Sequence, residues 1–335
     1  MKNLKIVQIG SAGHYEYALP ALKKYGFDLS AVAPGCEGEF MRRALRDYDR
    51  LGYSPVIYDD WKEMIDKENP DVVIINSIMC YNAEMSIYAL ERGINVFCEK
   101  PVATTFSDLE RLKAAYYKAN EEKRVCFCGM YGITYTPHFE AARRLIRSGE
   151  IGEVRLVTAQ KSYRLGRREP FYSSREKLGG MIPWVAIHAI DWIYNLCGFR
   201  FKSVYASHSR VANGGNGDLE VSAQMIFEGE NGAMATVSSD YFRPAGSPTH
   251  DDDRIRVVGT KGIVEVRSGT VYHLCDGEKV IENVMPEHDL FESFCLEISG
   301  EGVCDCTAEE AFDTTAAALY ARSSADERKV FEINL

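Results

Sequence analysis

The sequence predicts an α/β protein with an N-terminal doubly wound parallel sheet and a C-terminal α/β domain that holds a large open, mostly antiparallel sheet. Three observations predict this fold class. A length of 335 residues fits about two domains. Up to residue 130, short apolar runs alternate with stretches of helical periodicity, which is typical of parallel strands joined by crossover helices. Beyond that point strand-like runs follow one another across turns alone, as in antiparallel sheets.

In the first part, short apolar runs are the predicted strands and the periodic stretches between them are the predicted helices. The strands are Leu4–Ile9, Asp28–Val32, Val72–Ile75, Asn95–Cys98 and Val125–Cys128, and the helices cover residues 13–25, 37–51, 82–92 and 106–121. The alternation of predicted strands and helices stops near residue 130, so we divide the chain there into domains of residues 1–130 and 131–335.

The second part opens with a predicted helix over residues 136–148 and a strand from Val154 to Ser162. Further strands follow over residues 201–282, separated by turns such as Asn213–Gly217 and Glu230–Gly232. Helices predicted at 183–197, 287–299 and 307–323 would cover one face of this sheet. The other face then needs a cover, and we expect a symmetric homo-oligomer, a dimer or a tetramer.

Charge and composition exclude several classes of partner. Lys and Arg number 39 against 49 Asp and Glu, a net charge of -10, which is the wrong sign for binding nucleic acid or an anionic membrane. The N-terminus lacks the apolar stretch of a signal peptide, and no run reaches the length of a membrane span. We therefore expect a cytoplasmic protein without nucleic-acid or membrane partners.

The ten cysteines are too sparse for a disulfide scaffold in a chain of this length. Cys126 and Cys128 are separated by one residue, as are Cys304 and Cys306, whereas zinc sites usually have two to four intervening residues. We predict no metal site.

A glycine turn follows the first strand, at Gly10-Ser11-Ala12-Gly13. Such strand-to-helix turns hold phosphates, because glycine lets the backbone approach closely and the helix N–H groups point at the anion. Against the pattern G-x-G-x-x-G, Gly10 fills the first position, Ala12 stands at the second and Tyr15 at the third. An ordinary strand-to-helix turn explains this segment equally well on its own.

The most specific motif is Glu99-Lys100-Pro101, which comes directly after a predicted buried strand. Ligands of open α/β sheets bind outside the carboxyl ends of the strands, so a lysine there is well placed for chemistry. Lys100 can donate to a substrate hydroxyl or relay its proton. The alternative is an exposed loop lysine paired with Glu99.

Taken together, the motifs resemble the glucose-fructose oxidoreductase, inositol dehydrogenase and rhizopine catabolism family (Gfo/Idh/MocA). The resemblance rests on the glycine turn, Glu99-Lys100-Pro101, Pro137, Gly149-Glu150-Ile151-Gly152-Glu153-Val154, Gly179-Gly180, His188 with Asp191, and Val257-Val258-Gly259-Thr260-Lys261-Gly262. It implies that residues 1–130 form an NAD(P)-binding Rossmann domain and residues 131–335 a domain for substrate binding and oligomerisation. It also implies hydride transfer between a nicotinamide cofactor and a sugar, cyclitol or sugar derivative.

The resemblance assigns roles to individual residues. Lys100 corresponds to the catalytic lysine and His188 to the histidine that closes the D-x-x-x-H signature, but Trp184 stands where that signature has its aspartate. An indole cannot act as a base, although it can stack on a sugar or donate one hydrogen bond. We assign cofactor binding to Gly10, Ser11, Ala12, Gly13, His14, Ser77, Asn82, Glu99 and Lys100, and substrate binding to Tyr163, Arg164, Arg167, Trp184, His188 and Asp191.

The choice between NAD and NADP stays open in the sequence. The second strand ends in Pro34-Gly35, where many NAD enzymes carry an acid, and neither that acid nor an arginine follows it directly. Glu37, Arg42 and Arg43 are the charged residues that can approach the ribose, and we favour NAD. Two other functions stay open: a nicotinamide-assisted elimination or glycoside cleavage without net redox, and a non-catalytic sensor of nucleotides or sugars.

Overall fold

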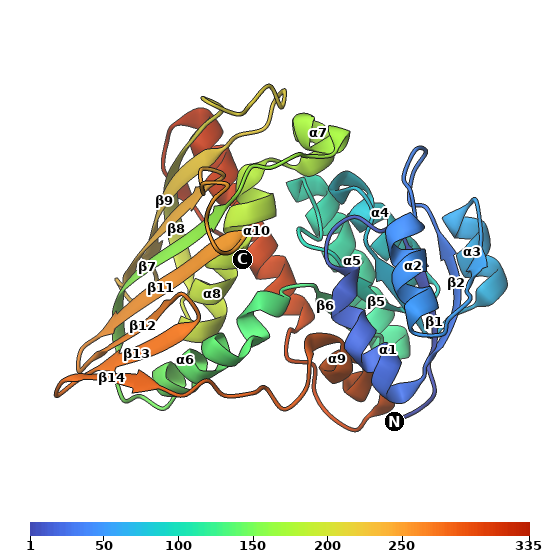
Figure 1. Cartoon of the computed structure of the whole chain (residues 1–335), viewed down its shortest axis with the longest axis horizontal. Coiled ribbons are helices and arrows are strands. Elements are labelled where there is room, and N and C mark those ends of the chain that lie inside the picture. The colour runs from blue at the N-terminus through green and yellow to red at the C-terminus, as the bar shows by residue number, and fades with distance from the viewer. The chain divides into compact units, whose positions relative to one another are not determined.

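The computed structural model describes all 335 residues, which divide into two compact units. The first unit comprises residues 1–132 and 288–312, and the second comprises residues 133–287 and 313–335. Each unit is built around one sheet, and both sheets are visible in Figure 1. The predicted fold class, a parallel sheet followed by a mostly antiparallel one, is confirmed.

The first unit holds a parallel sheet of six strands in the order β3-β2-β1-β4-β5-β6. The strand order reverses between β1 and β4, which is the doubly wound arrangement. The strands are β1 (Lys5–Ile9), β2 (Asp28–Ala33), β3 (Val56–Ile57), β4 (Val72–Ile75), β5 (Asn95–Cys98) and β6 (Phe127–Gly129). The helices are α1 (Leu19–Tyr25), α2 (Arg42–Arg50), α3 (Trp61–Glu68), α4 (Asn82–Glu91), α5 (Phe106–Lys123) and α9 (Leu290–Ser299).

Local sequence explains where these elements begin and end. All four residues of β4 are buried, as expected of a strand covered by helices on both faces. Helix α5 is capped at its start by Thr105, whose hydroxyl accepts the backbone N–H of Asp108 at 3.1 Å, and at its end by Arg124, which adopts the left-handed conformation. Helix α3 is capped in the same way by Asp60.

The structure corrects two predictions for this unit and adds two elements that were not predicted. The stretch predicted as helix 37–51 is helical only from Arg42, because residues 36–39 form a turn with Gly38 at a φ of 81°. The helix predicted over 13–25 starts with a 3-10 turn, Tyr15–Ala18. Strand β3 and helix α3 were not predicted, since β3 has only two residues and both are exposed.

The second unit holds a sheet of nine strands in the order β14-β13-β12-β11-β7-β10-β9-β8-β15. All its neighbours are antiparallel except β7 and β10, which run parallel. The strands are β7 (Val154–Tyr163), β8 (Phe201–Ser209), β9 (Ser222–Gly229), β10 (Met234–Asp240), β11 (Asp251–Gly259), β12 (Ile263–Arg267), β13 (Thr270–Leu274), β14 (Glu278–Ile281) and β15 (Phe331–Glu332).

Helices α6 (Pro137–Arg147) and α8 (Ile187–Cys197) pack on one face of this sheet (Figure 1). Phe139 of α6 stacks on Trp192 of α8 with ring centroids 4.6 Å apart, and this pair lies in the core. The short helix α7 (Arg175–Leu178) precedes α8, and α10 (Ala308–Glu327) runs from the first unit into the second.

The helix predicted at 287–299 does not cover the nine-stranded sheet. It forms α9, which belongs to the first unit. There Phe291 and Phe294 pack on Phe97 of β5, with ring centroids 4.9 and 5.6 Å apart. The aromatic side chains of α9 therefore complete the core of the parallel sheet.

No helix in the structure combines the length and the apolar character needed to cross a lipid bilayer.

Candidate functional site

The candidate site of the first unit lies where β1, β4 and β5 end. Backbone hydrogen bonds carry the strand pairing one residue past each strand: Asn76 N donates to Ile9 O and Glu99 N donates to Ile75 O, both at 2.8 Å. The turn after β1, the segment Asn76–Ser77 after β4 and Glu99–Lys100 after β5 are thereby held side by side. This edge is where doubly wound sheets bind their ligands.

The turn after β1 depends on its glycines. Gly10 and Gly13 have φ values of 71° and 83°, a backbone conformation that residues other than glycine rarely adopt. A Cβ at Gly13 would lie 2.3 Å from Oε2 of Glu99, so only glycine leaves room for that carboxylate. Tyr15, which takes the place of the pattern's last glycine, is fully buried and donates to Asp47 Oδ2 of α2 at 2.7 Å.

The Glu99 carboxylate is completely buried beneath this turn. Its Oε2 accepts the backbone N–H of His14 at 2.5 Å and the side-chain amide of Asn76 at 3.2 Å, and its Oε1 accepts the N–H of Lys100 at 3.1 Å. The His14 ring lies beside the same carboxylate, with Nδ1 3.0 Å from Oε1. Glu99 therefore ties the glycine turn to the strand end that carries Lys100.

Lys100 is 1% exposed, which excludes the exposed loop lysine considered as the alternative. The peptide bond between Lys100 and Pro101 is cis. Asn82, at the start of α4, donates from Nδ2 to the carbonyls of Glu99 at 3.0 Å and Pro101 at 3.1 Å. This buried amide fixes the backbone on both sides of Lys100.

Ser11 and Ser77 both contact one acidic side chain that the sequence analysis missed, Glu39. The N–H of Ser11 donates to Glu39 Oε1 at 3.2 Å, and the hydroxyl of Ser77 donates to Oε2 at 3.1 Å. Nothing in the pattern marked Glu39, because it follows the end of β2 by six residues and stands in a loop.

The candidate residues of the second unit centre on the start of α8. Residues Ile182–Ala186 form a π-helical turn that continues directly into α8. Trp184 lies in this turn, 5% exposed, with its ring edge-on to Tyr172 at 5.9 Å between centroids. His188 and Asp191 are 1% and 2% exposed, and Asp191 accepts a hydrogen bond from the hydroxyl of Thr134. π turns are rare and often occur at functional sites.

Tyr163 is the last residue of β7 in the same unit, and Arg164 follows it. The Tyr163 ring lies 5.0 Å from that of His250 and 6.2 Å from that of Tyr241, measured between centroids. Arg164 donates to the carbonyl of Ser247. Arg167 is exposed, whereas its neighbour Arg168 lies over the rings of Tyr241 at 4.6 Å and Tyr172 at 5.2 Å. Arg168 and Tyr172 were not in the predicted site, and no pattern distinguished Arg168 from Arg164 and Arg167.

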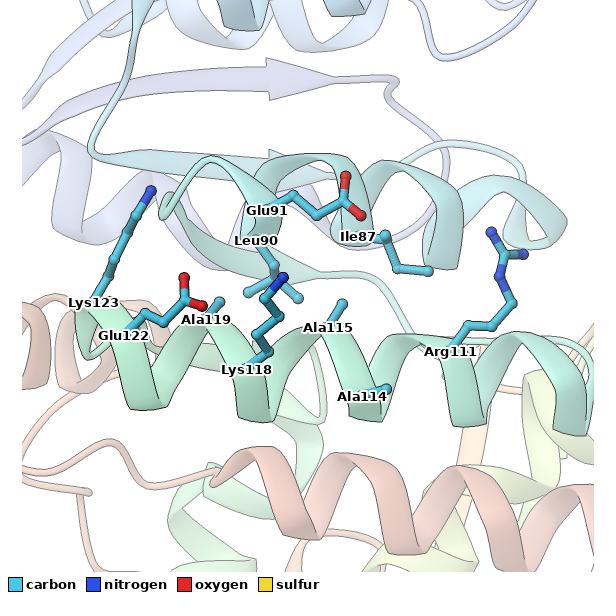
Figure 2. Close-up of a pocket in the computed structure, with 10 residues that line it drawn as sticks. All are labelled: Ile87, Leu90, Glu91, Arg111, Ala114, Ala115, Lys118, Ala119, Glu122 and Lys123. Atoms are coloured by element: carbon cyan, nitrogen blue, oxygen red, sulfur yellow. The ribbon is translucent and has the colours of Figure 1, made fainter.

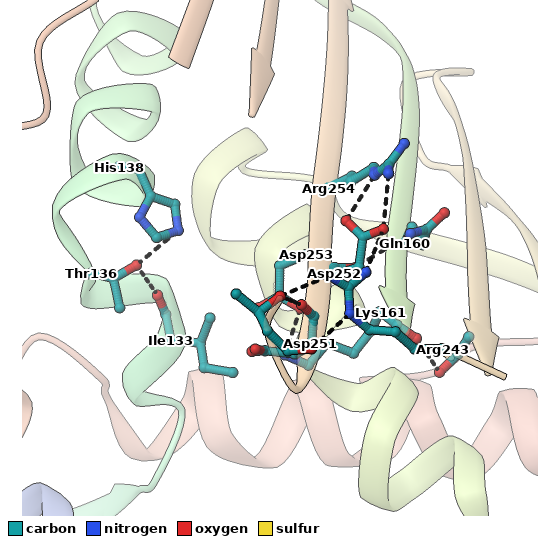
Figure 3. Close-up of polar contacts among 12 residues, drawn as sticks. Ile133, Thr136, His138, Gln160, Lys161, Arg243, Asp251, Asp252, Asp253 and Arg254 are labelled. Atoms are coloured by element: carbon teal, nitrogen blue, oxygen red, sulfur yellow. Dashed lines mark hydrogen bonds and ion pairs between the residues drawn. The ribbon is translucent and has the colours of Figure 1, made fainter. Parts of the chain in front are cut away.

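The buried Lys161 of β7 forms a polar cluster with Asp251 and Asp253 in the second unit (Figure 3). Nζ of Lys161 is fully buried and lies 2.6 and 2.7 Å from the two oxygens of Asp253 and 3.4 Å from Asp251. Burial raises the pKa of Asp253 to about 6 despite the opposing charge of Lys161. The aspartates stand on the interior strand β11, beside a cavity of about 350 Å³ that His138 and Arg243 also line.

A groove of about 540 Å³ lies between α4 and α5 (Figure 2). Its floor is made of Ile87, Leu90, Ala115 and Ala119, and charged side chains such as Arg111 and Lys123 stand around it. None of the predicted site residues lines this groove.

The two pairs of closely spaced cysteines meet in the core of the first unit. Burial raises the pKa of the Cys128 thiol well above its usual value, and hydrogen bonding to Cys304 and Cys306 raises it further. Cys126 Sγ lies 3.6 Å from Oε1 of Glu297. No group of three or more His, Cys, Asp or Glu side chains in the structure is arranged to hold a metal ion.

The predicted site residues therefore fall into two sets. Those assigned to the cofactor gather at one sheet edge of the first unit, together with Lys100. Those assigned to the substrate, including His188, belong to the second unit. Within the second set, Arg167 is exposed, whereas Trp184, His188 and Asp191 are buried.

Models of known families match two stretches of the chain. One, described as an oxidoreductase family with an NAD-binding Rossmann fold, matches residues 42–130. The other, described as the GFO/IDH/MocA C-terminal domain, matches residues 139–265.

Several curated proteins are similar to the chain. The scyllo-inositol 2-dehydrogenase (NAD(+)) of Bacillus subtilis is 27% identical over 309 residues, which cover 89% of this chain and 84% of the relative. An uncharacterised oxidoreductase of the same organism is 27% identical over 212 residues, 62% of this chain and 58% of its own length. The 2,7-anhydro-N-acetylneuraminate hydratase of Mediterraneibacter gnavus is 26% identical over 215 residues, 62% of this chain and 54% of its own length.

Solved structures extend the likeness over the whole chain. A Thermotoga maritima protein described as an oxidoreductase is 46% identical and superposes with a TM-score of 0.96 over 98% of this chain and 100% of that one. Levoglucosan dehydrogenase in complex with NADH and levoglucosan shares the fold, with 17% identity and a TM-score of 0.83 over 100% of both chains. The chain belongs to the Gfo/Idh/MocA family of NAD-binding oxidoreductases.

Proposed function

We propose that the protein is an NAD(P)-dependent dehydrogenase that oxidises a secondary alcohol of a cyclitol or sugar, or reduces the corresponding ketone. One observation carries this proposal: the buried Lys100 stands one residue after the Glu99 carboxylate, which is bonded to the glycine turn. A proton-transfer group and a phosphate-binding turn thus share one sheet edge. The inositol dehydrogenase relative supports the class of substrate.

The residues at this edge fit a dinucleotide. Gly10 and Gly13 give the turn its left-handed backbone and let it pack against Asn76 and Glu99, at the sheet edge where doubly wound folds bind a pyrophosphate. We assign the turn to the pyrophosphate and the strand end at Lys100 to the nicotinamide and the reacting carbon. The bound nicotinamide supplies the hydride acceptor for alcohol oxidation.

The chain supplies the proton transfer and the orientation of the substrate. We assign to Lys100 Nζ the stabilisation of the negative charge that develops on the substrate oxygen. His188 or Lys100 takes the hydroxyl proton during oxidation and returns it during reduction. Asn82 and Glu99 act as positioning residues, since their hydrogen bonds fix the backbone on either side of Lys100.

The substrate residues proposed for the second unit are Tyr163, Arg164, Trp184, His188 and Asp191. Trp184 stands where the family signature implies an aspartate, so this position carries an indole ring in place of the expected carboxylate. A sugar or cyclitol presents apolar C–H faces that stack on such a ring. Asp191 lies on the same helix as His188, α8, and its carboxylate accepts a hydrogen bond from the Thr134 hydroxyl.

The test is a substrate panel with an optical readout. The purified protein is incubated with NAD⁺ or NADP⁺ and with inositols, sugars, polyols or uronic acids, and absorbance at 340 nm is followed. We expect reduced cofactor to accumulate with at least one cyclitol or sugar. Calorimetry that detects no binding of NADH or NADPH at millimolar concentration would contradict the proposal.

A second candidate function is elimination or hydration of a sugar derivative without net redox. The similarity to a hydratase favours keeping it, as does the loss of the signature carboxylate at Trp184. In that reaction the substrate is oxidised and reduced again within one turnover. Product then forms with no net change at 340 nm, which separates the two functions.

A further inference from the structure

Two arginines that follow β7 carry positive charge that no acidic side chain of the protein pairs with. Arg164 donates from Nη2 to the carbonyl of Ser247, and Arg168 donates from Nη2 to the carbonyl of Arg164 at 2.8 Å. The Nε atom of each arginine is buried and has no hydrogen-bond partner. A desolvated charge without a counter-ion destabilises the folded chain unless a ligand supplies the opposite charge. The two guanidiniums are therefore arranged to receive an anion.

Tyrosine rings fix the position of Arg168. Its guanidinium lies over the ring of Tyr241 at 4.6 Å and over that of Tyr172 at 5.2 Å. The ring of Tyr172 in turn meets Trp184 edge-on, with 5.9 Å between centroids. A guanidinium that stacks on aromatic faces keeps the N–H groups at its edge available for a ligand. Arg168 is thus held one ring away from Trp184, the side chain that we assign to the face of the sugar.

The uncharged groups around Arg168 also suit an anion. Tyr241 is 2% exposed, and its buried hydroxyl has no hydrogen-bond partner in the structure. Burial raises the pKa of Tyr241 well above its usual value, so the hydroxyl keeps its proton and can donate it to a hydrogen bond. Burial lowers the pKa of His250, and the charge of Arg168 lowers it further, although Asp251 opposes this. The imidazole is therefore neutral at pH 7 and adds no charge.

The other charges of this cluster indicate the charge of the ligand. The carboxylates of Asp253 and Asp251 lie 2.6 and 3.4 Å from Nζ of Lys161, so both pair with that lysine and not with the arginines (Figure 3). One lysine and two arginines against two aspartates leave a single positive charge unmatched. A carboxylate balances this charge, whereas a phosphate ester carries about two negative charges at pH 7. The balance therefore favours a carboxylate.

We propose that Arg168 and Arg164, together with the Tyr241 hydroxyl, bind the carboxylate of a sugar acid, so that the protein prefers an acidic sugar to a neutral one. The proposal rests on the dehydrogenase function proposed above and narrows its class of substrate. A guanidinium presents its N–H donors in a rigid planar fork that matches the two oxygens of a carboxylate. Arg168 therefore determines specificity and takes no part in moving the proton.

The test is calorimetric titration of the protein, saturated with NADH, with glucuronate, galacturonate and mannuronate, with the neutral parent sugars and with their 6-phosphates. We expect at least one uronate to bind at least tenfold more tightly than its neutral parent. Arg168→Gln should bind that uronate about tenfold to a hundredfold more weakly, because a charged hydrogen bond is lost, and should bind the neutral parent as before. The matched control is Arg210→Gln, which removes an exposed arginine of the same unit and should keep the wild-type preference.

The possible failures are distinguishable. If neither NADH nor NADPH binds the wild type, the proposed function fails as well. If NADH binds but no uronate binds more tightly than its neutral parent, or Arg168→Gln weakens both equally, the carboxylate site is wrong while the function stands. If the 6-phosphates bind more tightly than the uronates, the site takes a phosphate and the proposal is overturned. Circular dichroism shows whether each variant is folded, and Tyr241→Phe, which keeps the ring under Arg168, should weaken uronate binding roughly threefold to tenfold.

Discussion

At the scale of single residues, the proposed chemistry depends on the side chains buried around Lys100. Glu99, Asn82 and Lys100 are each 1% exposed or less, and the first two hold the backbone that carries the third. The bonds donated by Asn82 Nδ2 and those accepted by Glu99 restrain this buried backbone and make it rigid. Rigidity of this kind is expected where a proton must be moved at a fixed position.

The thiols offer a test of burial that needs no substrate. Burial raises the pKa values of Cys98, Cys126 and Cys197 to about 12, whereas Cys275 is exposed. Because only the thiolate reacts, a thiol with a raised pKa reacts more slowly at a given pH. Iodoacetamide at pH 8 should therefore label Cys275 in the native protein and leave the other three intact, as read by peptide mass spectrometry. Rapid labelling of Cys98 would show that the strand end beside Lys100 is open.

Trp184 gives a prediction about the substrate. Trp184→Phe keeps an aromatic ring but loses the indole N–H, so we expect KM to rise roughly threefold to tenfold, the effect of one lost hydrogen bond, with little change in kcat. Trp184→Asp should extend the range of accepted substrates toward that of relatives with the aspartate. Steady-state kinetics on the best substrate measures both. Trp61→Phe, in helix α3 of the other unit, is the control. A fall in kcat alone would argue against a binding role.

At the scale of elements, the sequence pattern predicted the buried strands well and the loops poorly. Strands β4 and β5 were predicted with their observed bounds, since continuous apolar runs between turns leave few alternatives. The start of α2 was misplaced, because the charged segment 37–41 has helical composition and its turn depends on Gly38. That loop delivers Glu39, so the same misplacement hid the acid.

The candidate site was predicted to different extents in the two units. Gly10, Glu99 and Lys100 belong to a contiguous strand-end pattern whose chemistry can be read locally. Arg168, Tyr172 and Tyr241 come together only through tertiary packing of the loop after β7 with β10, which periodicity does not encode. Likewise, nothing in the sequence indicates that residues 288–312 return to the first unit.

At the scale of the whole molecule, the open face of the nine-stranded sheet gives the basis for the predicted homo-oligomer. Leu156 and Met234 are register neighbours on this face, as are Tyr205 and Ile226, and each is between 43% and 48% exposed. The four side chains come from the adjacent strands β7, β10, β9 and β8. An apolar patch on the uncovered face of a sheet is typical of an interface with a second copy.

Charge placed in this patch should weaken the assembly. We expect Ile226→Lys to shift the mass measured by light scattering from that of a dimer or tetramer toward that of one chain. Val211→Lys, at an exposed loop position, should leave the mass unchanged. A wild-type protein that scatters as a single chain at micromolar concentration would remove the basis for the oligomer.

Our central proposal is that Lys100 acts in the chemical step of dinucleotide-dependent oxidation, by stabilising the charge on the substrate oxygen or by taking the hydroxyl proton. The most direct measurement is the turnover of Lys100→Met, followed at 340 nm with NAD⁺ and the best substrate, together with its affinity for NADH. We predict that turnover falls by about two to four powers of ten, the usual contribution of general acid-base catalysis, while NADH affinity changes little. Lys118→Met, on the exposed side of α5, should match the wild type. Near wild-type turnover in Lys100→Met would contradict the mechanism even though the fold stands.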